Sequence, residues 1–166
     1  MQVRSEVDLP RLLDRLVEAE VPGRRGLDAW QAFIRSHATL MRRLGAELQE
    51  KTGLGLGDFD VLAQLALAGG ELRMTELAAR ALISRSAMTR RVVRLVDQRL
   101  VRRTGDDADA RGVVIGLTKA GVARLTEAVS VHMRGVSELF LGPLDDEELA
   151  VLRRALDKVS VDTTFG

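Results

Sequence analysis

The feature that most restricts the fold of this chain is a change of hydrophobic period near residue 100. Before it, apolar residues recur at steps of three and four, which is the spacing of one face of an α-helix. Residues 100–103 and 113–117 instead form two short runs with apolar residues, separated by the polar turn 104–112. This pattern predicts a β-hairpin directly behind a helix.

Two short helices are expected before the hairpin. The first is predicted over 75–81 with the Thr75 hydroxyl as its N-cap, and the second over 84–98 with Ser84 as its N-cap. Only two residues separate them, which is typical of a helix-turn-helix. Together with the hairpin, and with a buried helix over 58–67 in front, these elements predict a winged-helix arrangement.

Amphipathic helices flank this central region on both sides. A long helix is expected over 27–51, preceded by a shorter one that Asp8 caps. Thr118 caps a further long helix, and Asp145 with Glu148 forms a capping box for the last one. Their apolar seams carry more residues than one winged-helix core can cover, so we expect a second copy of the chain to cover part of them.

The expected fold is therefore mainly α with a small β-hairpin wing (α+β), built as a single domain over residues 1–166. Residues 1–53 are predicted to be N-terminal helices that contribute to dimerisation, and residues 54–118 the winged helix-turn-helix lobe. Residues 119–166 are predicted to be C-terminal dimerisation helices. A twofold dimer of this kind presents two recognition helices roughly 34 to 36 Å apart, which suits an inverted-repeat DNA site.

Charge is unevenly distributed along a chain that is nearly neutral as a whole. The 25 Lys and Arg residues and the 24 Asp and Glu residues leave a net charge of +1. From Arg85 to Arg103, seven arginines accompany one acid, Asp97, for a charge of +6, and the other 18 basic and 23 acidic residues give −5. A basic block in an otherwise acidic protein is the footprint of a nucleic-acid contact. A solvated arginine-rich helix face is the alternative.

The expected DNA contacts begin at the N-terminus of the second helix of the helix-turn-helix. Free backbone N–H groups near Ser84 and Ser86 favour a phosphate. Arg85, Thr89 and Arg90 have the spacing to reach base edges and backbone in a major groove. The candidate DNA-binding residues are Thr75, Ser84, Arg85, Ser86, Thr89, Arg90, Arg91, Arg94 and Arg111.

The turn of the hairpin carries three aspartates as well as Arg111. A calcium loop is excluded, because such a loop needs an oxygen ligand where Arg111 stands and a glutamate where Thr118 stands. We expect Arg111 to enter the minor groove as a wing-tip cation, with Asp109 fixing the loop by pairing to an arginine. A solvated hairpin turn is the alternative.

Several segments occur in a fixed order along the chain: LRMTELA (72–78), SRSAMTR (84–90), RL (94–95), LVRR (100–103), DAR (109–111) and LTKAG (117–121). In order and register they resemble the MarR (multiple antibiotic resistance regulator) family, over about residues 27–159. The resemblance implies a homodimeric winged-helix transcription regulator, usually a repressor, that often releases DNA when a small phenolic or anionic ligand binds. It implies DNA contacts at Ser84, Ser86, Thr89, Arg90 and Arg111, with Asp109 supporting the wing.

A small aromatic or anionic effector is the further partner that we expect. Both histidines of the chain lie at apolar-seam positions of long helices, and with three aromatic residues they could line a pocket between the dimer helices and the winged-helix core. A hydrogen-bonded core histidine is the alternative for each. The candidate effector-pocket residues are Trp30, Phe33, His37, Phe59, Asp60 and His132.

The extra N-terminal helix and the positions of Asp60 and Arg91 resemble the urate-responsive members of the family. Arg91 stands where the family more often has an apolar residue. It is open to three interpretations: an additional DNA contact, an internal salt-bridge partner or a ligand anchor.

Several other classes are disfavoured. The chain has no cysteine, a Gly-x-Ser-x-Gly elbow is absent, and the two histidines lie 95 positions apart, so we expect neither an enzyme nor a metal site nor a cofactor. The longest uncharged stretches, 61–70 and 112–118, fall far short of the roughly 20 apolar residues of a membrane span. With charged residues where a signal peptide needs its apolar run, a cytoplasmic location is expected.

The alternative function is a protein-interaction module that keeps the winged-helix scaffold without binding DNA. It predicts missing arginines on the second helix, and they are present. RNA binding by base stacking is disfavoured, because no aromatic residue lies between Arg80 and Arg111.

Overall fold

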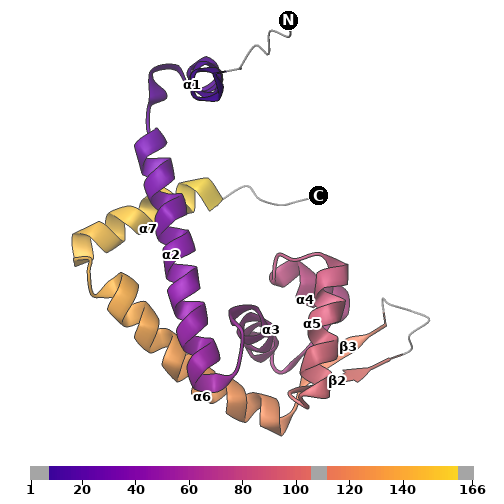
Figure 1. Cartoon of the computed structure of the whole chain (residues 1–166). Helices are drawn as coiled ribbons and strands as arrows, with labels where there is room; N and C mark the ends of the chain where they lie inside the picture. The colour runs from indigo at the N-terminus through magenta and orange to yellow at the C-terminus, as the bar shows by residue number, and fades with distance from the viewer. Residues whose placement is uncertain (1–7, 106–111, 161–166) are drawn as a thin grey trace, which may run out of the picture. The chain divides into compact units, whose positions relative to one another are not determined.

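A computed structural model of the chain describes residues 8–105 and 112–160 (Figure 1). The chain divides into two compact units, Met1–Thr39 and Leu40–Gly166. The described elements are α1 (Leu9–Glu20), η1 (Pro22–Arg24), α2 (Leu27–Thr52), α3 (Leu56–Leu67), β1 (Glu71–Arg73), α4 (Met74–Arg80), α5 (Arg85–Asp97), β2 (Val101–Thr104), β3 (Val114–Leu117), α6 (Lys119–Val136), η2 (Ser137–Leu141) and α7 (Asp146–Ser160).

The first unit holds α1, the short 3-10 turn η1 and the beginning of α2. The predicted cap of α1 is confirmed: the Asp8 carboxylate accepts a hydrogen bond from the Arg11 backbone N–H at 3.2 Å. Three leucines at helical spacing, Leu9, Leu13 and Leu16, form an exposed apolar face on α1.

The second unit holds the predicted helix-turn-helix and hairpin. Helices α4 and α5 are joined by a short turn in which Leu82 adopts a left-handed backbone conformation with φ +53°. Strands β2 and β3 form the expected antiparallel hairpin. A further strand, β1, pairs antiparallel with β3, so the sheet has three strands in the order β1-β3-β2. The sequence did not predict β1, because three residues are too short to display a two-residue period.

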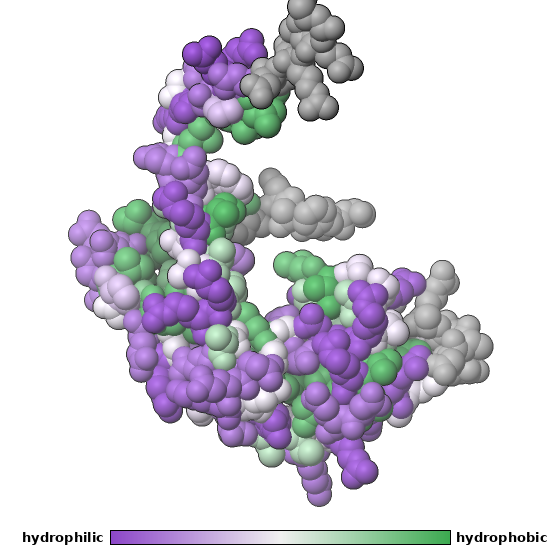
Figure 2. All heavy atoms as spheres, in the orientation of Figure 1, coloured by the Kyte–Doolittle hydropathy of each residue, from purple (hydrophilic) through white to green (hydrophobic). Residues whose placement is uncertain are grey.

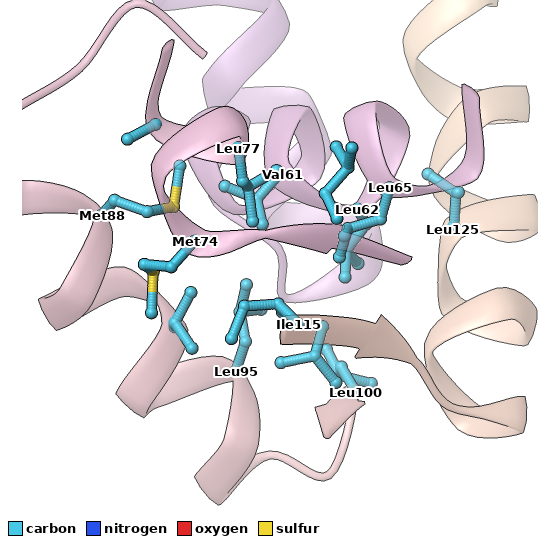
Figure 3. Close-up of a cluster of buried hydrophobic side chains, with 14 of the residues drawn as sticks. Val61, Leu62, Leu65, Met74, Leu77, Met88, Leu95, Leu100, Ile115 and Leu125 are labelled. Atoms are coloured by element: carbon cyan, nitrogen blue, oxygen red, sulfur yellow. The ribbon is translucent and has the colours of Figure 1, made fainter. Parts of the chain in front are cut away.

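The core of the second unit is assembled from the apolar faces of α2, α3, α4, α5 and α6 and from the sheet. Leu62 and Leu65 of α3, Leu77 of α4, Leu95 of α5 and Ile115 of β3 are fully buried. Figure 3 shows these side chains gathered between the helices and the sheet. Burial of one such side chain contributes about 1.5 to 3 kcal/mol, so together they hold the helices against the sheet.

Two predicted helix starts are wrong. Helix α3 begins at Leu56 rather than at 58, because Gly55 has an extended backbone and serves as its N-cap. Helix α4 begins at Met74 with Arg73 as N-cap and no side-chain cap, so Thr75 does not cap it. The sheet explains the second error: strand β1 leads directly into α4, and the Met74 N–H donates to the Val113 carbonyl at 2.9 Å.

The flanking helices of the second unit have the predicted caps. The Thr118 hydroxyl accepts from the Gly121 N–H at 3.0 Å. Asp145 and Glu148 form the reciprocal capping box, with backbone N–H to carboxylate distances of 2.9 and 2.8 Å. Helix α6 ends at Val136 and continues as the π-helical turn η2. No helix in the described ranges is long and apolar enough to cross a membrane.

Candidate nucleic-acid interface

Helix α5 is fixed along one face and open along the other. Met88, Val92 and Leu95, spaced by four and three residues, are buried in the core. Ser84 caps the helix as predicted, with its hydroxyl accepting from the Ala87 N–H at 3.3 Å. Hydrophilic side chains cover the region of α5 in Figure 2. The helix therefore presents a polar face in a fixed orientation.

The predicted contact residues in the first half of α5 lie on this polar face. Arg85, Ser86, Thr89 and Arg90 are all exposed, as is the cap Ser84. The Thr89 hydroxyl donates to the Arg85 carbonyl at 3.0 Å, and the Ser84 and Ser86 hydroxyls lie 3.2 Å apart. Within the described part of the chain, the guanidinium groups of Arg85 and Arg90 have no ion-pair or hydrogen-bond partner. Their charge is available to an external anion.

Two arginines further along α5 are instead directed to Asp58, which lies in the first turn of α3 and is buried. The distance from Arg94 Nη2 to Asp58 Oδ1 is 2.9 Å, and that from Arg91 Nη1 to the same oxygen is 3.8 Å. A Cβ on Gly57 would overlap Arg91 Nη1, so the absence of a side chain there makes room for this guanidinium. The geometry thus gives Arg91 an internal salt-bridge partner.

The remaining predicted DNA contacts are placed as follows. Thr75 lies in the first turn of α4 and is half-buried. Arg111 and Asp109 lie outside the described residues. The sequence did not single out Asp58, Glu71 or Arg102, although Asp58 pairs with Arg91 and Arg94 of α5 and Arg102 forms an ion pair with Glu71 at 2.9 Å. Asp58 and Arg94 are 36 positions apart, and no local spacing rule connects them.

A small cavity of about 110 Å³ lies beside the polar face of α5. Its walls are mostly apolar, and none of the predicted effector-pocket residues belongs to them. It is lined by Met74, Thr89, Val92, Val93, Val96, Asp97 and Arg103.

Three of the predicted effector residues form an aromatic row on α2 in the first unit. The ring centroids of Trp30 and Phe33 are 6.1 Å apart, and those of Phe33 and His37 are 6.3 Å apart. Trp30 is 59% exposed and Phe33 is 44% exposed. This row is therefore a surface feature of that unit.

The other predicted effector residues lie in the second unit. The rings of Phe59 and His132 pack with centroids 4.7 Å apart. His132 Nδ1 is buried without a hydrogen-bond partner among the described residues, and burial lowers the pKa of this histidine. Asp60 does not join the charge cluster of Arg91, since its Oδ1 lies 3.5 Å from Gln64 Nε2 and Asp58 faces the arginines instead.

Comparison with known proteins assigns the fold and the sequence to one group. A model of the MarR family matches residues 52–112. The HTH-type transcriptional regulator PecS of Dickeya dadantii (strain 3937) is 31% identical over 111 residues, which are 66% of this chain and 66% of PecS. Sco3205, a MarR family transcriptional regulator from Streptomyces coelicolor solved in complex with DNA, is 30% identical with a TM-score of 0.73, over 79% of this chain and 82% of that one. A MepR-like protein solved with pseudoligands is 34% identical with a TM-score of 0.62, over 81% and 94% of the two chains.

The winged helix-turn-helix and its exposed basic helix define a class of protein, the DNA-binding transcription regulators. Within that class, this chain belongs to the MarR family. The resemblance drawn from the sequence is confirmed, and the family is one of transcription regulators rather than enzymes.

Proposed function

We propose that this chain is a homodimeric repressor that binds an inverted-repeat operator in double-stranded DNA and releases it when a small aromatic or anionic effector binds. One observation carries the DNA part. Helix α5 is anchored by its buried face, while Arg85 and Arg90 on the other face have no partner among the described residues. Arginine suits this role because its planar fork matches both guanine edges and phosphates. The solved complex of Sco3205 with DNA supports the same kind of ligand.

The proposed DNA contacts differ along the helix-turn-helix and the hairpin. The N–H groups near Ser84 and Ser86 receive a phosphate, while Thr89 and Arg90 reach base edges in the major groove. Arg85 and Thr75 add contacts to the phosphate backbone, and Arg111 enters the minor groove with support from Asp109. Arg91 and Arg94, which Asp58 holds, contribute mainly to the positive potential of the surface.

The proposed dimer interface uses the flanking helices, residues 1–53 and 119–166, around the DNA-binding lobe 54–118. Exposed apolar side chains favour this arrangement, because a monomer leaves them in water. They are Leu9, Leu13 and Leu16 on α1, Val122, Val129 and Met133 on α6, and Val151, Leu156 and Val159 on α7.

The proposed effector site is the neighbourhood of Phe59 and His132. The Phe59 ring beside His132, and a buried ring nitrogen with no hydrogen-bond partner among the described residues, suit an aromatic ligand that carries a hydroxyl or carboxylate. The MepR-like protein solved with pseudoligands supports ligand binding on this scaffold. We also propose a cytoplasmic location for this chain, because its proposed ligand is cellular DNA.

The first test is selection of DNA from a pool of random duplexes by the full-length protein. We expect the enriched sequences to share an inverted repeat with half-sites about one helical turn apart. Recovery of no sequence above background, with no shift of any duplex by native gel electrophoresis, would refute DNA recognition. Size-exclusion chromatography with light scattering should give twice the mass of the 18.2 kDa chain.

The second test separates the effector from the DNA-binding activity. Salicylate, a small aromatic anion, is titrated into the complex of the protein with its selected duplex, and DNA release is followed by fluorescence anisotropy. We expect release by wild type and a weaker response by His132→Gln at unchanged DNA affinity. Equal responses of the two proteins would remove His132 from the site.

A further inference from the structure

One row of residues crosses all three strands of the sheet. In the register of the sheet, Gly116 of β3 stands opposite Glu71 of β1 on one side and opposite Arg102 of β2 on the other. Directly opposed residues of antiparallel strands have their side chains on the same face of the sheet. Glu71 and Arg102 therefore share a face and flank a residue that has no side chain.

The Arg102 guanidinium occupies the space that this glycine leaves. Its Nη2 lies 2.9 Å from Glu71 Oε2, and its Nη1 donates to the Leu117 carbonyl at 3.1 Å. A Cβ on Gly116 would lie 2.7 Å from both Cζ and Nη1 of Arg102. The side chain thus extends from one edge strand across the backbone of the central strand to the other edge strand.

This bridge joins the two parts of the DNA-binding lobe. Glu71 is the first residue of β1, which continues directly into α4 of the helix-turn-helix. Arg102 belongs to the hairpin, β2 and β3. Strand β1 has only three residues, so its backbone ladder to β3 is short. A second connection between the outer strands restricts the hairpin relative to the helix-turn-helix that begins with α4.

We infer that Arg102 and Glu71 form a positioning pair, which orients the hairpin for DNA binding without touching DNA, and that Gly116 is required to leave its path open. The inference rests on the proposed DNA-binding function. It removes Arg102 from the cations of the basic block that bind phosphate, since its charge is matched and two of its nitrogens are occupied. Both side chains are more than half exposed, so the pair adds little to the free energy of unfolding.

The direction in which Glu71→Ala changes DNA affinity distinguishes a positioning role of Arg102 from a purely electrostatic one. If Arg102 acted through its charge on DNA, Glu71→Ala would free that charge and tighten binding. If the pair positions the hairpin, Glu71→Ala and Arg102→Ala both weaken binding to the selected duplex, by about two- to fivefold on the scale of an exposed ion pair. Affinity is measured by fluorescence anisotropy over a range of salt concentrations.

The salt dependence supplies a second readout. Arg102→Ala should leave the slope of log Kd against log salt unchanged, whereas loss of a phosphate contact lowers it by about 0.9. The reversed pair, Arg102→Glu with Glu71→Arg, should restore affinity. Tighter binding by Glu71→Ala, or a reduced slope in Arg102→Ala, would overturn the inference.

Gly116→Ala tests the path of the side chain. The nearest atoms to the added methyl belong to the end of the long Arg102 side chain, so the fold should persist while the guanidinium is displaced. We expect it to weaken binding as Arg102→Ala does, with no further loss in the double variant. Additive losses would contradict a shared mechanism.

Hydrogen exchange of the β2 and β3 amides gives a readout that needs no DNA. Exchange should be faster in Arg102→Ala and Gly116→Ala than in wild type, at an unchanged unfolding midpoint. If exchange is unchanged in both variants, the positioning pair is refuted, whether or not a DNA duplex has been selected. If exchange is faster but the protein binds no DNA, the pair stands and the proposed DNA-binding function is refuted.

Discussion

The two halves of the basic block show how differently identical side chains can be used. In the first half of α5, Arg85 and Arg90 are exposed and have no partner among the described residues. In the second half and in the hairpin, Arg94 is paired with Asp58 and Arg102 with Glu71, each at 2.9 Å. Local charge density in a sequence therefore overstates the positive charge that DNA meets, because acids distant in the sequence neutralise part of it.

The largest expected effect comes from breaking the pair at Asp58. Asp58→Ala leaves Arg91 and Arg94 without their acid, in a site where the Arg91 Nε is buried and has no hydrogen-bond partner among the described residues. We expect the free energy of unfolding to fall by about 3 kcal/mol, measured by urea denaturation. Asp60→Ala, two residues away on the same helix, is the matched control and should change stability by less than about 0.5 kcal/mol. Similar losses in both variants would contradict a specific role for Asp58.

The contrast between the two halves is tested directly by Arg90→Ala and Arg94→Ala. Arg90→Ala should reduce affinity for the selected duplex by about 1 to 3 kcal/mol while leaving the unfolding midpoint unchanged. Arg94→Ala should show the opposite pattern, with lower stability and a small change in affinity, because its partner is internal. Anisotropy and urea titrations on the same preparations provide both quantities. Equal affinity losses would mean that the two halves do not differ in function.

Gly57→Ala tests whether Arg91 needs the space beside Gly57 to reach Asp58. The new methyl would overlap the Arg91 guanidinium, so that side chain must leave its place beside Asp58. We expect a loss of about 1 to 2 kcal/mol in unfolding free energy, on the scale of overpacking a filled site. Adding Arg91→Ala should recover part of the loss, because it removes the clash. A neutral Gly57→Ala variant would show that the space is not needed.

The smallest expected effect is at the C-terminal end of α5. Arg99 has φ +60°, and the Leu100 N–H donates to the Leu95 carbonyl at 2.9 Å, which is a Schellman motif with arginine at the position that favours glycine. Arg99→Gly should raise the free energy of unfolding by about 0.5 to 1 kcal/mol, seen as a higher thermal midpoint. DNA affinity should stay the same if this end of the helix lies away from DNA. Arg99→Ala, which keeps the strain, is the control and should not be stabilising.

The features that the sequence predicted correctly depend on neighbouring residues. The caps at Ser84, Thr118 and Asp145 each involve a partner three positions away, so the local order of residues is enough to predict them. The cap predicted at Thr75 was wrong because the pairing of β1 with β3 decides where α4 begins. Local rules could not include that contact.

The ion pairs could not be predicted from the sequence for the same reason. Arg102 and Glu71 are 31 positions apart, and their contact follows from the register of a strand too short to recognise. Predicting which arginines of the basic block face solvent therefore required the sheet topology and the burial of Asp58. The DNA contacts of Ser84, Ser86, Thr89 and Arg90 remain predictions. They rest on the sequence and on the exposure of these four residues.

The order of the strands also affects how readily two molecules can associate through their sheets. Because β3 lies in the centre, β2 is an edge strand, and an open strand edge can recruit a strand from another molecule and start aggregation. Here that edge is only four residues long and carries Arg102 and Arg103. So short an edge offers another strand few backbone groups to pair with, which disfavours association of two molecules through their sheets.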